Sequence, residues 1–248
     1  MRHTIALILI LTAFSAVAQD QSLQDNIMAA MASDLRSEDE VERDKNRKPV
    51  ETLTFFQMRD DMRVLELLPG GGWYTKILAP VLREKGEFYV ALGTDRIRDG
   101  LAGEDGFDNI NVVEPGVELV RDGEFGTRNV AEFSFGVKDL DLVLTFRNMH
   151  NFTAAGRANI NAAVFEALRP GGLFGVIDHS RRHMEPSTAE NRRRVDVVQI
   201  ILEAQAAGLV LVASSDLHYR PDDELRYEVG RKTVTGNTDR MTLLFRRP

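Results

Sequence analysis

One stretch, RVLELLPGGGWYTKILAPVL from Arg63 to Leu82, constrains the fold of this chain more than any other. Its first half, Val64 to Leu68, is a short apolar run with one glutamate, and Pro-Gly-Gly-Gly follows it. A short apolar run that ends at a turn signal is typical of a buried parallel strand. The second half carries apolar residues at helical spacing, namely Trp73, Ile77, Leu78, Val81 and Leu82. The stretch therefore predicts a strand, a glycine turn and a helix, which open a βαβ unit.

The turn between this strand and this helix favours a ligand site. Glycine adopts backbone angles closed to other residues, and because it lacks a Cβ atom a ligand can lie against the main chain. The N–H groups of the following helix then face the ligand, and Glu66 near the strand end can accept hydrogen bonds from it. Two nucleotide motifs are excluded: Trp73 and Thr75 break the dinucleotide pattern G-x-G-x-x-G, and no Gly-Lys-Ser/Thr of a P-loop follows.

Further apolar segments predict six more strands, at residues 87–92, 110–113, 140–146, 173–177, 209–214 and 241–245. Helices are expected at 155–169 and 189–207, and residues 114–138 are expected to form an irregular or hairpin insertion. Alternating strands and helices indicate a parallel sheet with helices on both faces. Because no helix separates the last two predicted strands, the final strand should run antiparallel.

The residues Glu66-Leu67-Leu68-Pro69-Gly70-Gly71-Gly72 resemble motif I of class I S-adenosylmethionine (SAM)-dependent methyltransferases, acidic-x-G-x-G-x-G, with Leu68 in place of the first glycine. The segment Leu168-Arg169-Pro170-Gly171-Gly172 and the antiparallel ending are also characteristic of that class. Across residues 37–248 the chain resembles a family of predicted exported bacterial methyltransferases. The matching pieces are Arg43-Asp44 with Arg47 and Pro49, Pro69 to Tyr74, Thr145 to Asn148 with His150, Asp178-His179, Asp222-Asp223, and Thr238 to Arg240 with Arg246-Arg247-Pro248.

This resemblance implies a Rossmann-like α/β fold with a seven-stranded, mostly parallel sheet, and it implies SAM as the cofactor. The residues that would hold the cofactor are Glu66, Pro69, Gly70, Gly71, Gly72, Tyr74, Asp95 and Asn148. In the family, an acid at the end of the second strand holds the ribose hydroxyls. Here Leu92 stands at that position, so Asp95 is expected to replace the acid, or else to be a turn residue. Asn148 would bind the methionine end, or cap the loop before the next helix.

Three strand ends bring polar residues to the place where a doubly wound sheet binds its ligand: Glu66 to Tyr74, Arg147 to Asn151, and Asp178 to Arg182. His150 and His179 are the candidate catalytic bases, because a histidine can take a proton from a hydroxyl near neutral pH. Each histidine has an equal alternative as a supporting or helix-capping residue. Asp178 would orient His179, or satisfy a backbone turn.

Several other classes of protein are excluded or disfavoured. A net charge of −7 and a pI near 5.4 argue against a nucleic-acid partner, so a small-molecule acceptor is expected. His150, Asp178, His179 and His183 have no recognised metal-ligand spacing, so no metal is expected. A serine hydrolase is disfavoured because the sequence has no G-x-S-x-G motif.

The first residues differ from the rest of the chain. Arg2 and His3 precede an apolar run from Ile5 to Phe14, and Ala16-Val17-Ala18 follows, which is the pattern of a secretory signal peptide. The expected organisation is a signal peptide at 1–18, an N-terminal helical segment at 19–60 and a methyltransferase-like domain at 61–248. The helical segment would be a lid or substrate wall, or a structural brace. Cleavage between Ala18 and Gln19 would leave a periplasmic or secreted protein without stable membrane insertion.

Two functions are consistent with these observations. The first is SAM-dependent methyl transfer to a small or exposed acceptor, such as a hydroxyl. The second is an exported, non-catalytic module that binds a nucleoside-like or anionic ligand on the same fold. The second arises because SAM is made in the cytosol, and because Leu68 and Leu92 depart from the methyltransferase pattern.

The signal-peptide hypothesis predicts that Ala18→Phe blocks processing, because the peptidase pocket accepts only a small side chain at this position. The variant should remain as a larger, membrane-attached form, whereas the unmodified chain should begin at Gln19. N-terminal sequencing and gel mobility check both outcomes. An intact Met1 on exported protein, with no size difference in the variant, would identify residues 1–18 as an anchor instead.

Overall fold

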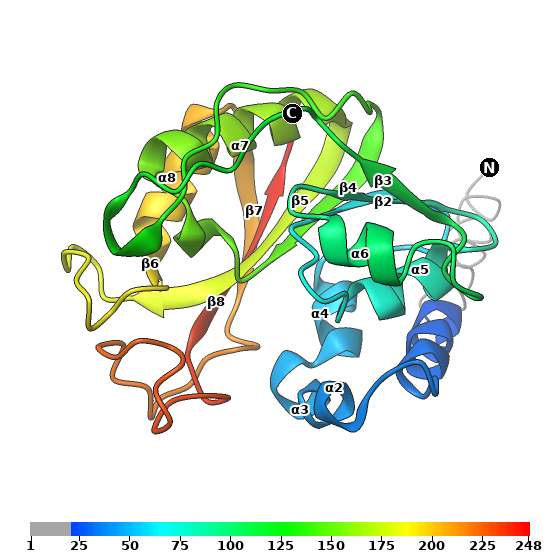
Figure 1. Cartoon of the computed structure of the whole chain (residues 1–248), viewed down its shortest axis with the longest axis horizontal. Helices are drawn as coiled ribbons and strands as arrows, with labels where there is room; N and C mark the ends of the chain where they lie inside the picture. The colour runs from blue at the N-terminus through cyan, green and yellow to red at the C-terminus, as the bar shows by residue number, and fades with distance from the viewer. Residues whose placement is uncertain (1–20) are drawn as a thin grey trace, which may run out of the picture.

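The apolar segments of the sequence come together as one sheet in the computed structural model, which describes residues 21–248 (Figure 1). Within these residues the sheet has eight strands, and seven of them lie in the order β3-β2-β1-β4-β5-β8-β7. Their bounds are β1 Arg63–Leu67, β2 Glu87–Ala91, β3 Ile110–Val113, β4 Leu140–Phe146, β5 Leu168–Arg181, β7 Val210–Ser215 and β8 Arg240–Arg246. The short strand β6, Val195–Asp196, pairs with the end of β5.

The register confirms the predicted mixture of strand directions. Strand β1 lies between β2 and β4 and is parallel to both, with Glu66 opposite Val90 and Leu144. Strand β8 is antiparallel to β5 and to β7. Chain order reverses between β1 and β4, so this is the point at which a doubly wound sheet opens a crevice for a ligand. The predicted Rossmann-like α/β fold is confirmed.

Helices cover both faces of the sheet, as the alternation predicted. One face carries α4 Pro49–Phe55, α5 Thr75–Leu82 and α6 Asp95–Gly100. The other carries α7 Ala154–Ala167 and α8 Val197–Ala206, which lie beside each other in Figure 1. Each face buries its own apolar cluster, with Phe56 and Ile77 in one and Ile160 and Val164 in the other. Burial on both faces explains why β1 reads as an almost continuous apolar run.

The helices before β1 form an N-terminal segment, here called the helical preface, which contacts the residues that follow the glycine turn. Residues 21–31 are helical, and α2 Glu38–Glu42 and α3 Asp44–Arg47 follow. Helix α2 begins with the capping box that its sequence contains, formed by Ser37 and Glu40. The indole Nε1 of Trp73 donates to the carbonyl of Glu40 at 2.8 Å, and Lys76 pairs with the Glu40 carboxylate at 2.8 Å. The preface is therefore fixed to the helix that follows the turn.

The predicted helix at 189–207 is wrong in its first half. Helix α8 begins only at Val197, because Asp196 is its N-cap and accepts a hydrogen bond from the N–H of Val198 at 2.9 Å. Arg194, which was expected in this helix, instead forms a bidentate ion pair with Asp223, with both hydrogen bonds at 2.9 Å. Strand β5 is also longer than expected, since its end pairs with β8 and places Asp178 and His179 within the strand.

The segment 114–138 has the hairpin character that its composition predicted. Val120 and Asn129 form an isolated antiparallel bridge, and a short 3-10 turn, η1 Glu124–Gly126, lies between them. Val130 and Phe135 are buried in the cluster that contains α7.

No helix within residues 21–248 is long and apolar enough to cross a membrane. The predicted signal peptide at 1–18 lies outside the described residues.

Replacing Gly175 by alanine should lower the free energy of unfolding by roughly 1–3 kcal/mol, because the added methyl group overpacks the core. A Cβ atom at this position in β5 would lie 2.8 Å from Leu144 Cδ2 and 2.8 Å from Phe56 Cδ1. Urea unfolding measures the change. Gly100→Ala is the control, because a Cβ there meets nothing within 4 Å. Equal stability of the two variants would contradict the packing described here.

Candidate active site at the carboxyl edge of the sheet

The ends of β1, β4 and β5 meet at one edge of the sheet, because these three neighbouring strands are parallel. Figure 1 shows α2 and α3 on one side of this edge and the segment at 216–239, before β8, on the other. Two cavities open here, and both are lined partly by α3 and by Arg147, which directly follows β4. This edge is therefore where a doubly wound fold places its ligand.

The first cavity lies over the glycine turn and has a volume of about 210 Å³. Six of the eight predicted cofactor-binding residues line it: Glu66, Pro69, Gly70, Gly71, Tyr74 and Asn148. A Cβ atom added at Gly70 or Gly71 would meet nothing within 4 Å, so the main chain of the turn is open to a ligand. The structure thus brings these six residues together, and their role in binding stays a prediction.

Glu66 is the buried acid of this cavity. Its side chain is 3% exposed, and the hydroxyl of Thr75 donates to its Oε2 at 2.6 Å. Burial raises the pKa of Glu66 to about 7, while the hydrogen bond from Thr75 and the charge of Arg47 act in the opposite direction. A cationic group beside Glu66 would therefore favour its ionised form.

Two predicted cofactor residues, Asp95 and Gly72, do not line this cavity. Asp95 begins α6, is exposed, and pairs with Arg98 at 2.9 Å, so its side chain is engaged outside the cavity. The end of β2 is instead occupied by the buried side chain of Leu92. Gly72 has a positive φ of 82°, and a Cβ there would lie 3.0 Å from Ile97 Cδ1. It lets α6 pack against the turn.

Asn148 and Tyr74 brace the walls of the cavity. The Nδ2 group of Asn148 donates to the carbonyls of Leu67 and Leu68, each at 3.3 Å, so it ties the end of β4 to β1. Its predicted capping of the loop before α7 does not occur. Tyr74 stacks on Phe146 with ring centroids 3.5 Å apart. These contacts fix the turn between β1 and α5.

Asp178 orients His150, whereas the sequence analysis paired it with His179. The Oδ1 atom of Asp178 lies 2.5 Å from Nδ1 of His150 and accepts from the N–H of His179 at 2.7 Å. Its Oδ2 atom accepts from the N–H of His150 at 2.8 Å. The alternative of a backbone-binding role is therefore also realised. His150 sits in the 3-10 turn η2 Met149–Asn151 after β4.

His179 has a different environment. Its Nδ1 atom lies 2.9 Å from the hydroxyl of Thr238, and its ring centroid is 5.6 Å from that of His150. Burial lowers the pKa of His179 well below its usual value, and the charges of nearby arginines lower it further. His179 is therefore neutral at pH 7. Of the two histidines, only His150 is paired with a carboxylate.

Three arginines belong to the site; the sequence analysis expected Arg147 there, within the strand end Arg147 to Asn151, and missed Arg47 and Arg240 as functional residues. Arg47 on α3, Arg147 after β4 and Arg240 at the start of β8 all line the second cavity, with a volume of about 560 Å³. For Arg47 and Arg240 the only signal in the sequence was their presence in the motifs that carry the family resemblance. Within the described residues there is no group of three or more His, Cys, Asp or Glu that could hold a metal ion.

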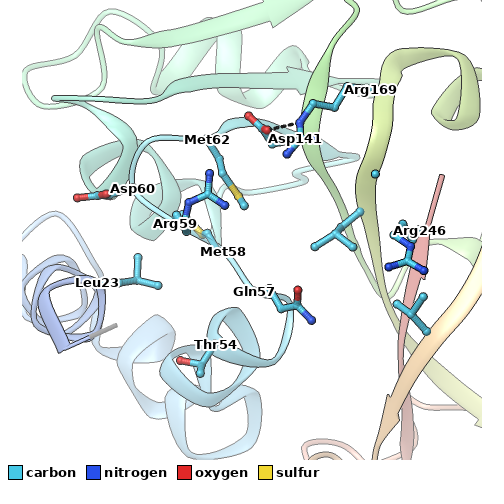
Figure 2. Close-up of a pocket in the computed structure, with 13 residues that line it drawn as sticks. Leu23, Thr54, Gln57, Met58, Arg59, Asp60, Met62, Asp141, Arg169 and Arg246 are labelled. Atoms are coloured by element: carbon cyan, nitrogen blue, oxygen red, sulfur yellow. Dashed lines mark hydrogen bonds and ion pairs between the residues drawn. The ribbon is translucent and has the colours of Figure 1, made fainter. Parts of the chain in front are cut away.

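A further cavity of about 500 Å³ lies at the opposite edge of the sheet (Figure 2). Figure 2 shows Asp141 and Arg169 paired beside it, with Arg246 nearby and Leu23 on the far side. Ligands of doubly wound sheets bind at the carboxyl ends of the parallel strands. This cavity is at their amino ends, so it is not the candidate active site.

Glu66 should make the protein less stable as the pH rises. Its pKa in the folded protein is about 7, against a usual value of 4.5. Its contribution to stability is therefore fully present below pH 4.5 and is lost as the pH rises through about 7. Between pH 5.5 and pH 8 the unfolding free energy of the wild type should fall by about 2 kcal/mol more than that of Glu66→Gln. Urea unfolding at both pH values measures this, with exposed Glu104→Gln as the control. Parallel pH profiles for wild type and Glu66→Gln would contradict the assignment.

Comparison with known proteins identifies the fold. No model of a protein family matches the sequence, and no curated protein matches it either. Among solved structures, a SAM-dependent methyltransferase from Aquifex aeolicus matches with a TM-score of 0.57 and 14% identity, over 83% of this chain and 93% of that one. The cyclase SpnF matches with a TM-score of 0.55 and 14% identity, over 82% and 80% of the two chains. The glycopeptide N-methyltransferase MtfA matches with a TM-score of 0.52 and 18% identity, over 82% and 96%. The chain has the Rossmann-like fold of class I SAM-dependent methyltransferases.

Proposed function

We propose that this protein is a SAM-dependent methyltransferase that acts on a small or exposed acceptor. The observation that carries the proposal is the glycine-turn cavity, where a buried acid and arginines face the same open main chain. The methionine end of SAM has one ammonium and one carboxylate group, so it needs such a pair of partners. The solved structures of MtfA with sinefungin and with S-adenosylhomocysteine, which match this chain with TM-scores of 0.51 and 0.50, support the choice of cofactor.

The residues of the cavity fit the methionine end of SAM. Glu66 would receive the ammonium group, and Arg47 or Arg147 would receive the carboxylate, because all three line the same space. The open turn at Gly70 and Gly71 would let the cofactor lie against the main chain. At the ribose end the family pattern is not met, since Leu68 stands in place of the first glycine and Leu92 in place of the ribose-binding acid.

His150 is the proposed catalytic base. SAM, when bound, supplies a methyl group on a positively charged sulfur. The Asp178 carboxylate can only accept hydrogen bonds, so it keeps the proton of His150 on Nδ1 and leaves Nε2 as an acceptor. Nε2 would take the proton from the acceptor's hydroxyl as that oxygen attacks the methyl group. His150 also borders the second cavity, which would hold the acceptor.

His179 and Thr238 are proposed to position the acceptor. Because His179 stays neutral at pH 7, it offers a hydrogen bond without competing for the proton. Its Nδ1 is fixed by Thr238, so its Nε2 has a defined direction. Export of the mature protein after cleavage at Ala18 remains part of this proposal.

The cofactor claim predicts that the protein binds SAM and S-adenosylhomocysteine in a calorimetric titration. Glu66→Gln should weaken SAM binding by roughly tenfold or more, since it removes a charge-assisted partner of the ammonium group. Exposed Glu104→Gln should bind as the wild type does. If neither compound bound at millimolar concentration, the proposal would fail, and the non-catalytic binding module would take its place.

The base assignment predicts that His150→Gln still binds SAM but transfers methyl groups roughly 10²–10⁴ times more slowly. The assay follows labelled methyl groups from SAM into small molecules of a cell extract. His183→Gln is the matched control, because His183 is exposed and lines neither cavity of the site. An undiminished rate in His150→Gln would rule out His150 as the base.

A further inference from the structure

The second cavity at the carboxyl edge is lined by positive charge. Five arginines contribute to its wall, namely Arg43, Arg47, Arg147, Arg193 and Arg240, and its lining includes no aspartate or glutamate. His150 and His179 border it as well. It shares Arg43, Arg47 and Arg147 with the glycine-turn cavity, so the two spaces adjoin each other.

Four of these arginines, Arg43, Arg47, Arg147 and Arg240, have no carboxylate partner among residues 21–248, and Arg43 is the exposed one of the four. The ion pairs of the described chain include Arg193, which pairs with Glu228, but not Arg47, Arg147 or Arg240. Arg47 and Arg240 are only 6% and 7% exposed. Arg240 donates from Nη1 to the carbonyl of Asn46 at 2.8 Å, and its Nε is buried without any hydrogen-bond partner.

Asp178 and Asp239, the acids whose charges act on Arg147 and Arg240, are already engaged by other groups. Asp178 holds His150 and two backbone N–H groups. The Oδ1 atom of Asp239 accepts from the backbone N–H of Arg220 at 2.9 Å. The phenol of Tyr74 stays neutral, because burial raises its pKa. The lining of the second cavity therefore offers its arginines no acid, and Glu66, whose pKa is about 7, lines only the adjoining glycine-turn cavity.

The energetic consequence is a cluster of buried cations that repel one another. Burial lowers the pKa of Arg47 to about 9 and that of Arg240 to about 10, and in both cases the charge of Arg147 adds to the effect. Both remain cationic at pH 7. Buried, unpaired charges destabilise a folded protein. An anion that binds beside these arginines would offset this cost, so the folded protein should be more stable with the anion bound.

We propose that the methyl acceptor carries an anionic oxygen group, phosphoryl or carboxylate, which Arg47, Arg147 and Arg240 bind in the second cavity. As an assignment of the acceptor, this rests on the proposed function. Planar guanidinium groups bind such oxygens through two parallel hydrogen bonds. The carboxylate of SAM would neutralise at most one arginine, on the side shared with the glycine turn. Arg240 lines only the second cavity, with both histidines, so a separate anion is needed there.

The test is thermal unfolding of the protein with inorganic phosphate, with malonate, and with sodium chloride at matched ionic strength, all without SAM. Saturating phosphate or malonate should raise Tm by about 4 °C or more beyond chloride. The anion that raises it more identifies the oxygen group. Arg147→Gln and Arg240→Gln should each lose this increment while the exposed Arg121→Gln keeps it. A merely structural arginine would lower Tm equally with and without anion, and that result would overturn the proposal.

Calorimetry with SAM separates this proposal from the proposed function. Phosphate should leave the affinity for SAM within about twofold, since the two ligands occupy adjoining sites; competition between them would overturn the acceptor assignment. If SAM binds but neither anion stabilises beyond chloride, the anion site is wrong and the methyltransferase stands. If anion stabilisation depends on Arg240 while SAM does not bind, the acceptor assignment fails together with the methyltransferase, and only an anion-binding module remains.

Discussion

One buried carboxylate, that of Asp178, joins the ends of the two strands on which the candidate chemistry depends. It is fully buried, and it accepts from the backbone N–H groups of His150 and His179 as well as pairing with Nδ1 of His150. Three donors therefore share its two oxygens. Removing the carboxylate would leave two buried N–H groups without partners, which destabilises by about 1–3 kcal/mol for each group. The carboxylate that connects β5 to the turn after β4 therefore also orients His150, the proposed base.

The arginine-lined wall of the site is built by segments from opposite ends of the chain. The carbonyl of Arg47 on α3 is 3.1 Å from Nε2 of His218, and the guanidinium of Arg47 lies 4.3 Å from the ring centroid of Trp73. Burial lowers the pKa of His218 to about 4, so this histidine is neutral at pH 7 and adds no further positive charge. Arg240 reaches across to the carbonyl of Asn46. The helical preface is thus a wall of the crevice as well as a brace for the glycine turn.

The sheet was predictable from sequence, while much of the site was not. Strands β1 and β4 were predicted to within one residue, because burial on both faces leaves a continuous apolar run with clear ends. The start of α8 was predicted too early, because the residues before Val197 are not helical. Arg194 pairs instead with Asp223, a contact between distant parts of the chain that the sequence does not reveal. The pairing of Asp178 with His150 likewise spans 28 residues and depends on the alignment of β4 with β5. Sequence reveals the arginines but not their burial without partners, which only tertiary structure produces.

The fold alone does not decide the chemistry, since a cyclase and methyltransferases share it. The charge distribution of this chain is more selective. Its net charge is −7, yet five arginines line the second cavity, whose lining includes no aspartate or glutamate. Beyond about 10 Å, salt screens the field of surface charges, so the overall negative charge does little to repel a small anion at the mouth. Inside, low-dielectric walls strengthen the attraction. A small anion that enters the second cavity would therefore meet the attraction of its arginines, which is the acceptor chemistry proposed above.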